Sequence, residues 1–152
     1  MSTQQTIRVV EDSPEDYEAT ERGFRRAELE SPLVHCETGD QALDYLYRRG
    51  ECERRENGQP GVILLDLNLP GTDGREVLRL VKSHENLKMI PVIVLTTSSA
   101  ERDIDECYRY GANSYIQKPV DLDGFRVSIQ RLKDFWMDGA ILPSSPRIER
   151  TP

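Results

Sequence analysis

An unbroken apolar run in the middle of the chain limits the possible folds more than any other feature. Val62–Leu65 holds only apolar residues and is followed directly by Asp66. A strand with one face in water alternates apolar and polar residues, so an unbroken run indicates a strand that is covered on both faces. Central strands of a parallel sheet have this property because helices pack on both sides. The run therefore predicts a parallel sheet between two helical layers.

Other apolar segments and helical patterns alternate along the rest of the chain. Four further strands are predicted, at Ile7–Val10, Leu33–Cys36, Pro91–Leu95 and Ser114–Gln117. Helices are predicted after Ser13-Pro14 and at Asp40–Tyr47, Gly74–Ser83, Glu101–Tyr110 and Asp121–Met137. This alternation is typical of a parallel sheet with helices on both faces. We therefore predict an α/β fold with a doubly wound five-stranded sheet, whose sites lie at the carboxyl ends of the strands.

Residues that favour helix ends support several of these boundaries. Ser13-Pro14 suits the cap and first position of the first helix, and Asp73 is expected to cap the third. Ser98 or Ser99 can cap the fourth helix, and Gly111 suits its C-terminal end. The fourth helix is expected to bury a stripe made of Ile104, Cys107 and Tyr108.

The last helix has two apolar sides. At 100° per residue, the side expected to face the core consists of Leu122, Phe125, Ile129, Leu132 and Trp136. The opposite side, expected to face solvent, consists of Gly124, Val127, Ser128, Arg131 and Phe135. Isolated apolar residues are normal on a protein surface. An aromatic and a β-branched residue on the solvent side nevertheless favour an interaction surface, most simply for a homodimer.

Composition and charge exclude several classes of protein. The net charge of −7 and the pI of about 4.9 argue against a nucleic-acid-binding module, which needs a basic face. No apolar run approaches the roughly 20 residues of a membrane span, and the polar start, Met1–Thr6, does not resemble a secretory signal. Cys36, Cys52 and Cys107 have no CxxC spacing, which indicates reduced thiols and a cytoplasmic location.

Polar residues of particular types follow four of the predicted strands. Glu11-Asp12 follows the first, Asp66 the third, Thr96-Thr97 the fourth and Lys118-Pro119 the fifth. Because the carboxyl ends of parallel strands lie at one edge of the sheet, these side chains should converge there. Three carboxylates so close together repel one another unless a cation lies between them, and Mg²⁺ suits oxygen ligands beside a phosphate. Lys118 would supply a positive charge and Thr96 a hydroxyl donor to phosphoryl oxygens.

Each of these residues has an ordinary structural explanation when it is taken alone. An acidic residue after a strand is usually a loop residue or a helix cap, and a single lysine such as Lys118 is usually a surface residue. Four such residue types at four strand ends, in this order, are much harder to explain by structure alone. The combination therefore predicts a phosphoryl-transfer site.

The chain resembles the receiver domains of two-component response regulators. The resemblance covers about residues 6–138 and rests on Val9–Pro14, Leu64–Gly74, Pro91–Thr97 and Tyr115–Pro119. It implies a flavodoxin-like fold with strand order 2-1-3-4-5. It also implies a receiver domain at 6–138, a flexible Pro-containing tail at 139–152, and no output domain.

The resemblance assigns a role to each matching position. Asp66 corresponds to the phospho-acceptor, and Lys118 corresponds to the lysine that contacts the phosphoryl group. Thr96 and Tyr115 correspond to a hydroxyl and an aromatic ring that change position together as a switch. The Mg²⁺ ligands are implied to be Glu11, Asp12, Asp66 and the backbone carbonyl of Asn68. The Lys118–Pro119 bond is often cis in this family, and Glu11 stands where an aspartate is common.

The resemblance also implies partners. Thr96–Ala100, Lys118–Leu122 and Asp134–Trp136 are similar to single-domain regulators that partner bacterial and cyanobacterial phytochrome kinases. A sensor histidine kinase would dock on the first helix, where Glu15, Ala19, Arg22 and Gly23 are expected to be exposed, and on the loop after Lys118. A homodimer would use the fourth helix, fifth strand and fifth helix. Such a protein catalyses only its own phosphorylation and dephosphorylation, and is not an enzyme in the usual sense.

Three other classes of protein fit the sequence less well. An aspartyl-nucleophile phosphatase usually has a second aspartate two residues after the nucleophile, where this chain has Asn68. A flavin- or nucleotide-binding module of similar topology would carry a glycine-rich phosphate loop, and neither GxGxxG nor GxxxxGK[ST] occurs. A receiver-like protein that binds partners without phosphorylation has no positive support, because every residue needed for phosphorylation is present.

Overall fold

The computed structural model describes residues 5–50 and 59–143. Its five parallel strands form one sheet in the order β2-β1-β3-β4-β5. The strands are β1 (Ile7–Val10), β2 (Leu33–Cys36), β3 (Val62–Leu65), β4 (Val92–Thr96) and β5 (Ser114–Gln117). The helices are α1 (Pro14–Arg26), α2 (Gly39–Tyr47), α3 (Gly74–Ser83), α4 (Glu101–Tyr110) and α5 (Leu122–Leu132). The predicted fold and strand order are confirmed, and β4 is shifted by one residue.

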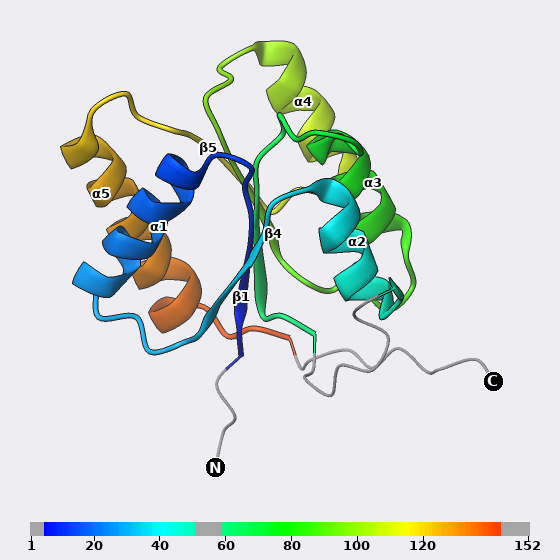
Figure 1. Cartoon of the computed structure of the whole chain (residues 1–152), viewed down its shortest axis with the longest axis horizontal. Coiled ribbons are helices and arrows are strands. Elements are labelled where there is room, and N and C mark those ends of the chain that lie inside the picture. Colours follow the sequence, from blue (N-terminus) through cyan, green and yellow to red (C-terminus); the bar gives the residue numbers. More distant parts are fainter. Residues whose placement is uncertain (1–4, 51–58, 144–152) are drawn as a thin grey trace.

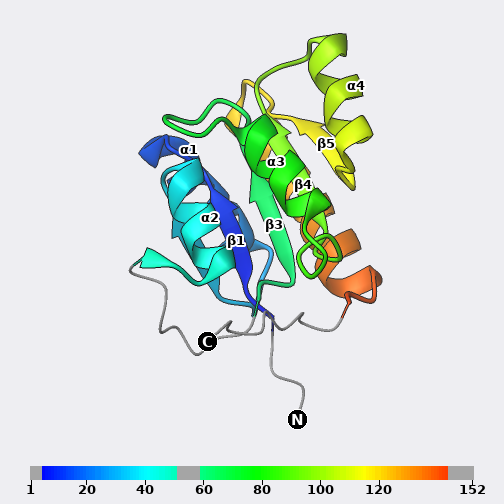
Figure 2. The same ribbon diagram turned by 90° about the vertical axis from the view of Figure 1, so that its right-hand side faces the viewer.

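Two helical layers enclose the sheet. α1 and α5 cover one face, and α2, α3 and α4 cover the other (Figures 1 and 2). Successive side chains of a strand point to opposite faces. Ile7 and Val9 of β1 therefore pack in the core under α1 and α5, whereas Val10 packs in the core under α2 and α3. β3 is buried at every position, as its unbroken apolar run predicts.

The helix caps agree with the sequence at three of the four predicted positions. The Ser13 hydroxyl accepts the backbone N–H of Asp16 at 3.2 Å, and Asp73 caps α3. Gly111 ends α4 with a φ of 106°, which favours glycine. The predicted cap of α4 is wrong, because Ala100 occupies the cap position. The Ser98 hydroxyl instead donates to Asp103 at 2.6 Å within the first turn.

Two residues that were expected in the core lie at the surface. Tyr108 of α4 is 49% exposed because its neighbour Cys107, which is fully buried, takes the inward position. Leu122, the first residue of α5, is 72% exposed. Helical side chains lean toward the helix N-terminus, so the side chain of a first residue extends past the helix end and away from the core.

The end of the last helix also differs from the prediction. The α-helix stops at Leu132 and continues as the wider π-helix η2 (Lys133–Gly139). Val127 and Phe135 are 47% and 61% exposed, as predicted for the solvent side. Trp136, expected on the core side, is only half-buried, and its ring and that of Phe135 pack in a T-shaped arrangement.

Several predictions concern residues outside the described ranges. Most of the loop expected between Arg48 and Gly61, together with Cys52, lies there, as does the tail from residue 144 onward. Within the described ranges, no peptide bond is cis, so the Lys118–Pro119 bond is trans. No helix in these ranges has the length and apolar character needed to cross a membrane.

Candidate functional site

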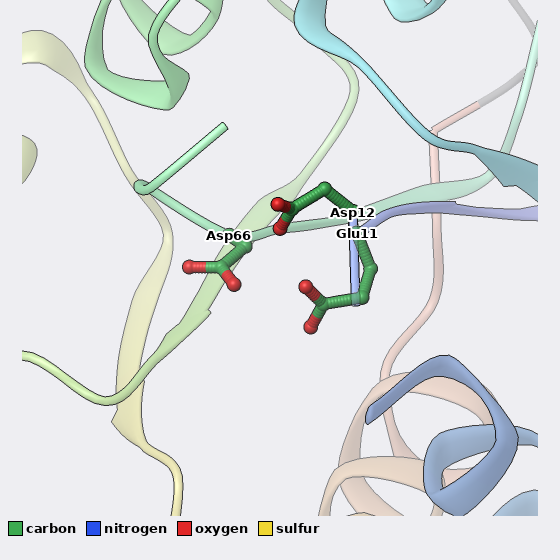
Figure 3. A group of neighbouring side chains, drawn as sticks. All are labelled: Glu11, Asp12 and Asp66. Atoms are coloured by element: carbon green, nitrogen blue, oxygen red, sulfur yellow. The ribbon is translucent and has the colours of Figure 1, made fainter. Parts of the chain in front are cut away.

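Three carboxylates meet at the carboxyl edge of the sheet. Glu11 and Asp12 follow β1, and Asp66 follows the adjacent β3, whose register places Val10 beside Leu65. The three side chains point toward a common space, and their ligand oxygens lie within 4.8 Å of one another (Figure 3). The predicted convergence of these strand ends is therefore confirmed.

The three acids differ in their exposure to water. Glu11 and Asp66 are buried, whereas Asp12 is exposed at the mouth of the site. Burial is the main reason that the pKa of Glu11 rises to about 7; Lys118 opposes this rise and the charge of Asp66 adds to it. The cluster therefore has an acidic interior and one ligand open to solvent.

Lys118 supplies the positive charge inside the site. The lysine is 6% exposed, and its Nζ donates to Glu11, to Asp16 Oδ2 at 2.8 Å and to Asp66 Oδ2 at 3.0 Å. Burial lowers the pKa of Lys118, but the hydrogen bonds to Asp16 and Glu11 outweigh burial and raise it. Lys118 therefore remains protonated. Its ammonium group lies where it can also donate a hydrogen bond to an incoming anion.

Asp16 belongs to this site and was not predicted from the sequence. It lies in the first turn of α1, where an acidic residue normally only complements the helix dipole. The available signal was its place in the first helical turn after Glu11-Asp12, because that turn begins beside the carboxyl end of β1. Many ordinary helices also have an acidic residue in their first turn, so this pattern alone does not indicate a functional site.

The loop after β3 holds the Asp66 side chain in place. The backbone N–H of Asn68 donates to Asp66 Oδ1 at 3.3 Å, and Gly74 N donates to the Leu67 carbonyl at 2.9 Å. A Cβ atom at Gly74 would overlap the backbone carbonyl of Asp66, so only glycine fits there. The role of the Asn68 carbonyl as a metal ligand remains a prediction.

The two predicted switch residues are connected through the loop between β4 and α4. Thr96 is fully buried at the end of β4, and its hydroxyl lies 3.5 Å from Ser98 N. The Tyr115 hydroxyl donates to the Ser98 carbonyl at 3.0 Å. Both residues thus contact Ser98, and their movement as a switch remains a prediction.

A second group of unpredicted residues fixes this loop. The carboxylate of Asp103 accepts the Ser98 hydroxyl at 2.6 Å and forms an ion pair with Arg75 of α3 at 2.8 Å. The Ser98 hydrogen bond is the main reason that the pKa of Asp103 is lowered, and Arg75 adds to this effect. No sequence pattern indicates this connection, because Arg75 and Asp103 come from different helices.

Comparison with known proteins identifies the family. The family model for the response regulator receiver domain matches residues 7–130, which include every site residue described above. The chain belongs to the response regulator receiver family. It is therefore a receiver domain of two-component signalling, and its cluster of carboxylate oxygens is suited to a divalent metal ion.

Several relatives resemble this receiver over nearly its whole length. Response regulator Rcp1 of Synechocystis is 37% identical, with 91% of this chain and 93% of Rcp1 covered. The Mn²⁺-bound structure of Rcp1 superposes with a TM-score of 0.87 at 36% identity, covering 92% of this chain and 99% of that one. The phosphorylated cyanobacterial phytochrome response regulator RcpA has a TM-score of 0.88 at 37% identity, covering 93% and 100%. Bacteriophytochrome response regulator RtBRR is 42% identical, with a TM-score of 0.75, covering 95% and 85%.

Proposed function

We propose that this receiver accepts a phosphoryl group onto Asp66 from a sensor histidine kinase in the cytoplasm and signals through its own surface. One observation carries the proposal: the buried Asp66 carboxylate lies 3.0 Å from Lys118 Nζ and beside two further carboxylates. The nucleophile, a fixed cation and a set of hard oxygen ligands are thereby brought together. The protein would act only on itself, forming and later losing its own acyl phosphate.

The residues of the site have distinct tasks in this reaction. A carboxylate oxygen of Asp66 attacks the phosphorus, and the P–N bond to the donor imidazole breaks as the new P–O bond forms. Glu11, Asp12 and Asp66 would hold Mg²⁺, which supplies positive charge for the phosphoryl oxygens. Lys118 gives a second fixed charge, and it can release Asp16 or Glu11 to contact a phosphoryl oxygen.

The kinase is proposed to be a phytochrome. Support comes from the relatives, because RcpA is described as a phytochrome response regulator and RtBRR as a bacteriophytochrome response regulator. The direct test of phosphoryl acceptance is incubation with acetyl phosphate, with and without Mg²⁺. We expect one acid-stable, base-labile phosphoryl group per chain, and only when Mg²⁺ is present. The same assay with a purified phytochrome kinase then tests the partner separately.

The face formed by α1 and the start of α5 is the proposed kinase-docking surface. Arg22, Leu122 and Arg126 are exposed on it and line a small hollow between the two helices. Ala19 is half-buried, and the prediction that Gly23 is exposed is wrong. A Cβ atom at Gly23 would lie 3.1 Å from Ile129, because α1 packs closely against α5 there. Leu122, which was predicted to lie in the core, is exposed and supplies an apolar contact for the kinase on this surface.

Reversing a charge and removing the apolar contact on this surface should slow phosphotransfer from the kinase but not labelling by acetyl phosphate. We expect Arg22→Glu combined with Leu122→Ser to reduce phosphotransfer from the kinase at least about tenfold, equal to about 1.4 kcal/mol. Acetyl phosphate should label the variant at the rate of the parent, since neither residue contacts the site. Arg102→Glu, an exposed site on α4, is the matched control. Equal loss with both donors would show that the variant damaged the site itself.

A homodimer through α4, β5 and α5 is the proposed form of signalling. Val127 and Phe135 are exposed, and a hollow of about 320 Å³ lies beside Phe135. Ile116 of β5 and Leu132 of α5 also line this hollow. In a two-fold dimer, the same patch would meet its own copy.

Charges placed on this patch should prevent dimer formation. We expect Val127→Glu with Phe135→Glu to sediment as a monomer at tens of micromolar, where the parent with a phosphoryl mimic forms a dimer. Met89→Glu is the matched control, because Met89 is 50% exposed after α3. A parent that is monomeric with and without the mimic would rule out the dimer.

Phosphorylation should change the surroundings of Tyr115. The phosphoryl group adds strong acceptors near Thr96, so we expect Thr96 to move toward it and the Tyr115 ring to enter the space left behind. NMR of ring-labelled tyrosine should show shifted Tyr115 signals after addition of a phosphoryl mimic. Tyr110, which donates to Glu106 on α4, should change little. Unchanged Tyr115 signals would contradict a switch.

A further inference from the structure

One arginine connects the start of α3 to the first turn of α4. Arg75 Nη1 donates to the two carboxylate oxygens of Asp73 at 3.1 and 3.2 Å. Its Nε and Nη2 lie 3.1 and 2.8 Å from one oxygen of Asp103, on the neighbouring helix of the same layer (Figure 1). The side chains of Arg75 and Asp103 are only 25% and 19% exposed, so water screens this ion pair less than it screens one at the open surface.

The other oxygen of Asp103 fixes Ser98 in the loop between β4 and α4. It accepts the Ser98 hydroxyl at 2.6 Å, and that hydroxyl accepts the backbone N–H of Ala100 at 3.3 Å. The Ser98 carbonyl accepts the Tyr115 hydroxyl at 3.0 Å, and Ser98 N lies 3.5 Å from the Thr96 hydroxyl. Every polar group of Ser98 thus takes part in this arrangement, so a movement of either switch residue disturbs Ser98.

The start of α3 is a firm support for this connection. Asp73 caps the helix, and Gly74 N donates to the Leu67 carbonyl at 2.9 Å. A Cβ atom at Gly74 would overlap the backbone carbonyl of Asp66, so the helix start lies directly against the segment that carries the acceptor carboxylate. Arg75 follows at the next position. The ion pair therefore ties the loop between β4 and α4 to a closely packed part of the molecule.

We propose that the ion pair between Arg75 and Asp103 restrains the switch, because it holds Ser98 in the arrangement observed here. This inference rests on the proposed function, in which phosphorylation of Asp66 moves the Tyr115 ring. That movement either breaks the hydrogen bond from Tyr115 to the Ser98 carbonyl or carries Ser98 away from Asp103. Both routes lose contacts of the observed arrangement, so phosphorylation must work against the ion pair.

This restraint predicts a change of unusual sign. An interaction that favours one arrangement lowers the affinity for a ligand that favours the other. Arg75 and Asp103 are positioning residues, since neither belongs to the three-carboxylate cluster. Removing the ion pair should therefore tighten the binding of a phosphoryl mimic, whereas a variant that only damages the fold should weaken it. Beryllium fluoride with Mg²⁺ is the probe, because it binds a carboxylate oxygen and imitates a phosphoryl group.

Two single variants and their combination test the ion pair. Asp103→Asn removes the charge but keeps one oxygen that can accept the Ser98 hydroxyl, and Arg75→Gln removes the cation. We expect each variant to bind beryllium fluoride about fivefold more tightly than the parent. The double variant should gain no more than either single one, because both remove the same contact. Arg79→Gln is the matched control, since it breaks an exposed ion pair with Glu76 one turn further along α3 and should leave binding unchanged.

Two results would overturn the restraint. One is binding that is unchanged or weaker in the single variants, and the other is gains that add in the double variant. NMR of ring-labelled tyrosine gives an independent readout without the mimic. The Tyr115 signals of Asp103→Asn should move part of the way toward their position in the parent with the mimic, because a weaker restraint increases the population of the switched arrangement. Signals that stay at the parent position would contradict the proposal.

The parent protein separates this inference from the proposed function. If the parent does not bind beryllium fluoride, or binds it without any change at Tyr115, the proposed function fails and the restraint fails with it. If the parent binds the mimic and its Tyr115 signals shift, but the variants behave like the parent, only the restraint is refuted.

Discussion

Asp66→Asn should abolish phosphoryl incorporation from acetyl phosphate and from a kinase. An amide oxygen is a poor nucleophile and cannot form the acyl phosphate, so we expect no base-labile phosphate on the variant. The fold should persist, because asparagine has the same shape and its single side-chain oxygen can still accept one of the two bonds made to the Asp66 oxygens, from Asn68 N or from Lys118 Nζ. Phosphate is counted by intact-mass spectrometry, and unfolding in urea confirms stability.

A matched variant separates the nucleophile from its surroundings. Asp16→Asn removes a different carboxylate that also contacts Lys118, at 2.8 Å. It should retain phosphoryl incorporation within a few-fold, since Asp16 is neither the nucleophile nor a member of the three-carboxylate cluster. Incorporation at the parent level in Asp66→Asn would refute Asp66 as the acceptor. A complete loss in Asp16→Asn would mean that the position of Lys118 controls the reaction.

Asp12→Ala should separate metal binding from stability. Removing one of three crowded carboxylates relieves like-charge repulsion, so the metal-free variant should be at least as stable as the parent. Asp12 is exposed and makes no ion pair within the described residues, so little native contact is lost. The affinity for Mg²⁺ should fall at least about tenfold, equal to about 1.4 kcal/mol.

Titration calorimetry and urea unfolding measure the two effects in one preparation. Asp105→Ala removes an exposed carboxylate from α4 and should change neither quantity. Trp136 is a poor reporter for this titration, because it packs against Phe135 at the far end of α5 rather than at the acidic cluster. Unchanged Mg²⁺ affinity in Asp12→Ala would place the metal elsewhere.

The fold was predictable because apolar segments, unbroken in β3, alternate with helical patterns along the chain. The convergence of Glu11, Asp12, Asp66 and Lys118 then follows from the parallel topology alone, since all four lie at carboxyl ends of strands. Assigning a role to each of these residues required the resemblance to a family, because convergence alone does not distinguish a nucleophile from a metal ligand.

The remaining features depend on packing that a sequence pattern does not contain. From the sequence, Asp16 looks like an ordinary acidic residue in the first turn of a helix. Arg75 forms an ion pair with Asp103 only because α3 and α4 are neighbours. Leu122 is exposed because it is the first residue of its helix. The periodicity of apolar residues does not distinguish the end of a helix from its middle, so it placed Leu122 in the core. The burial of Gly23 reflects the close approach of α1 and α5, again a property of two elements together.

The strand order has a consequence for how the protein forms as it leaves the ribosome. β1 is the first strand to be synthesised, yet it lies inside the sheet and waits for both β2 and β3. Glu11, Asp12 and Asp66 can meet once β3 has paired, whereas Lys118 arrives only when β5 is added at the edge. Pairing of distant segments is slow relative to local helix formation. Pairing in the order of synthesis would bring the acidic residues together before their counter-charge, and the strand that neutralises them would dock last.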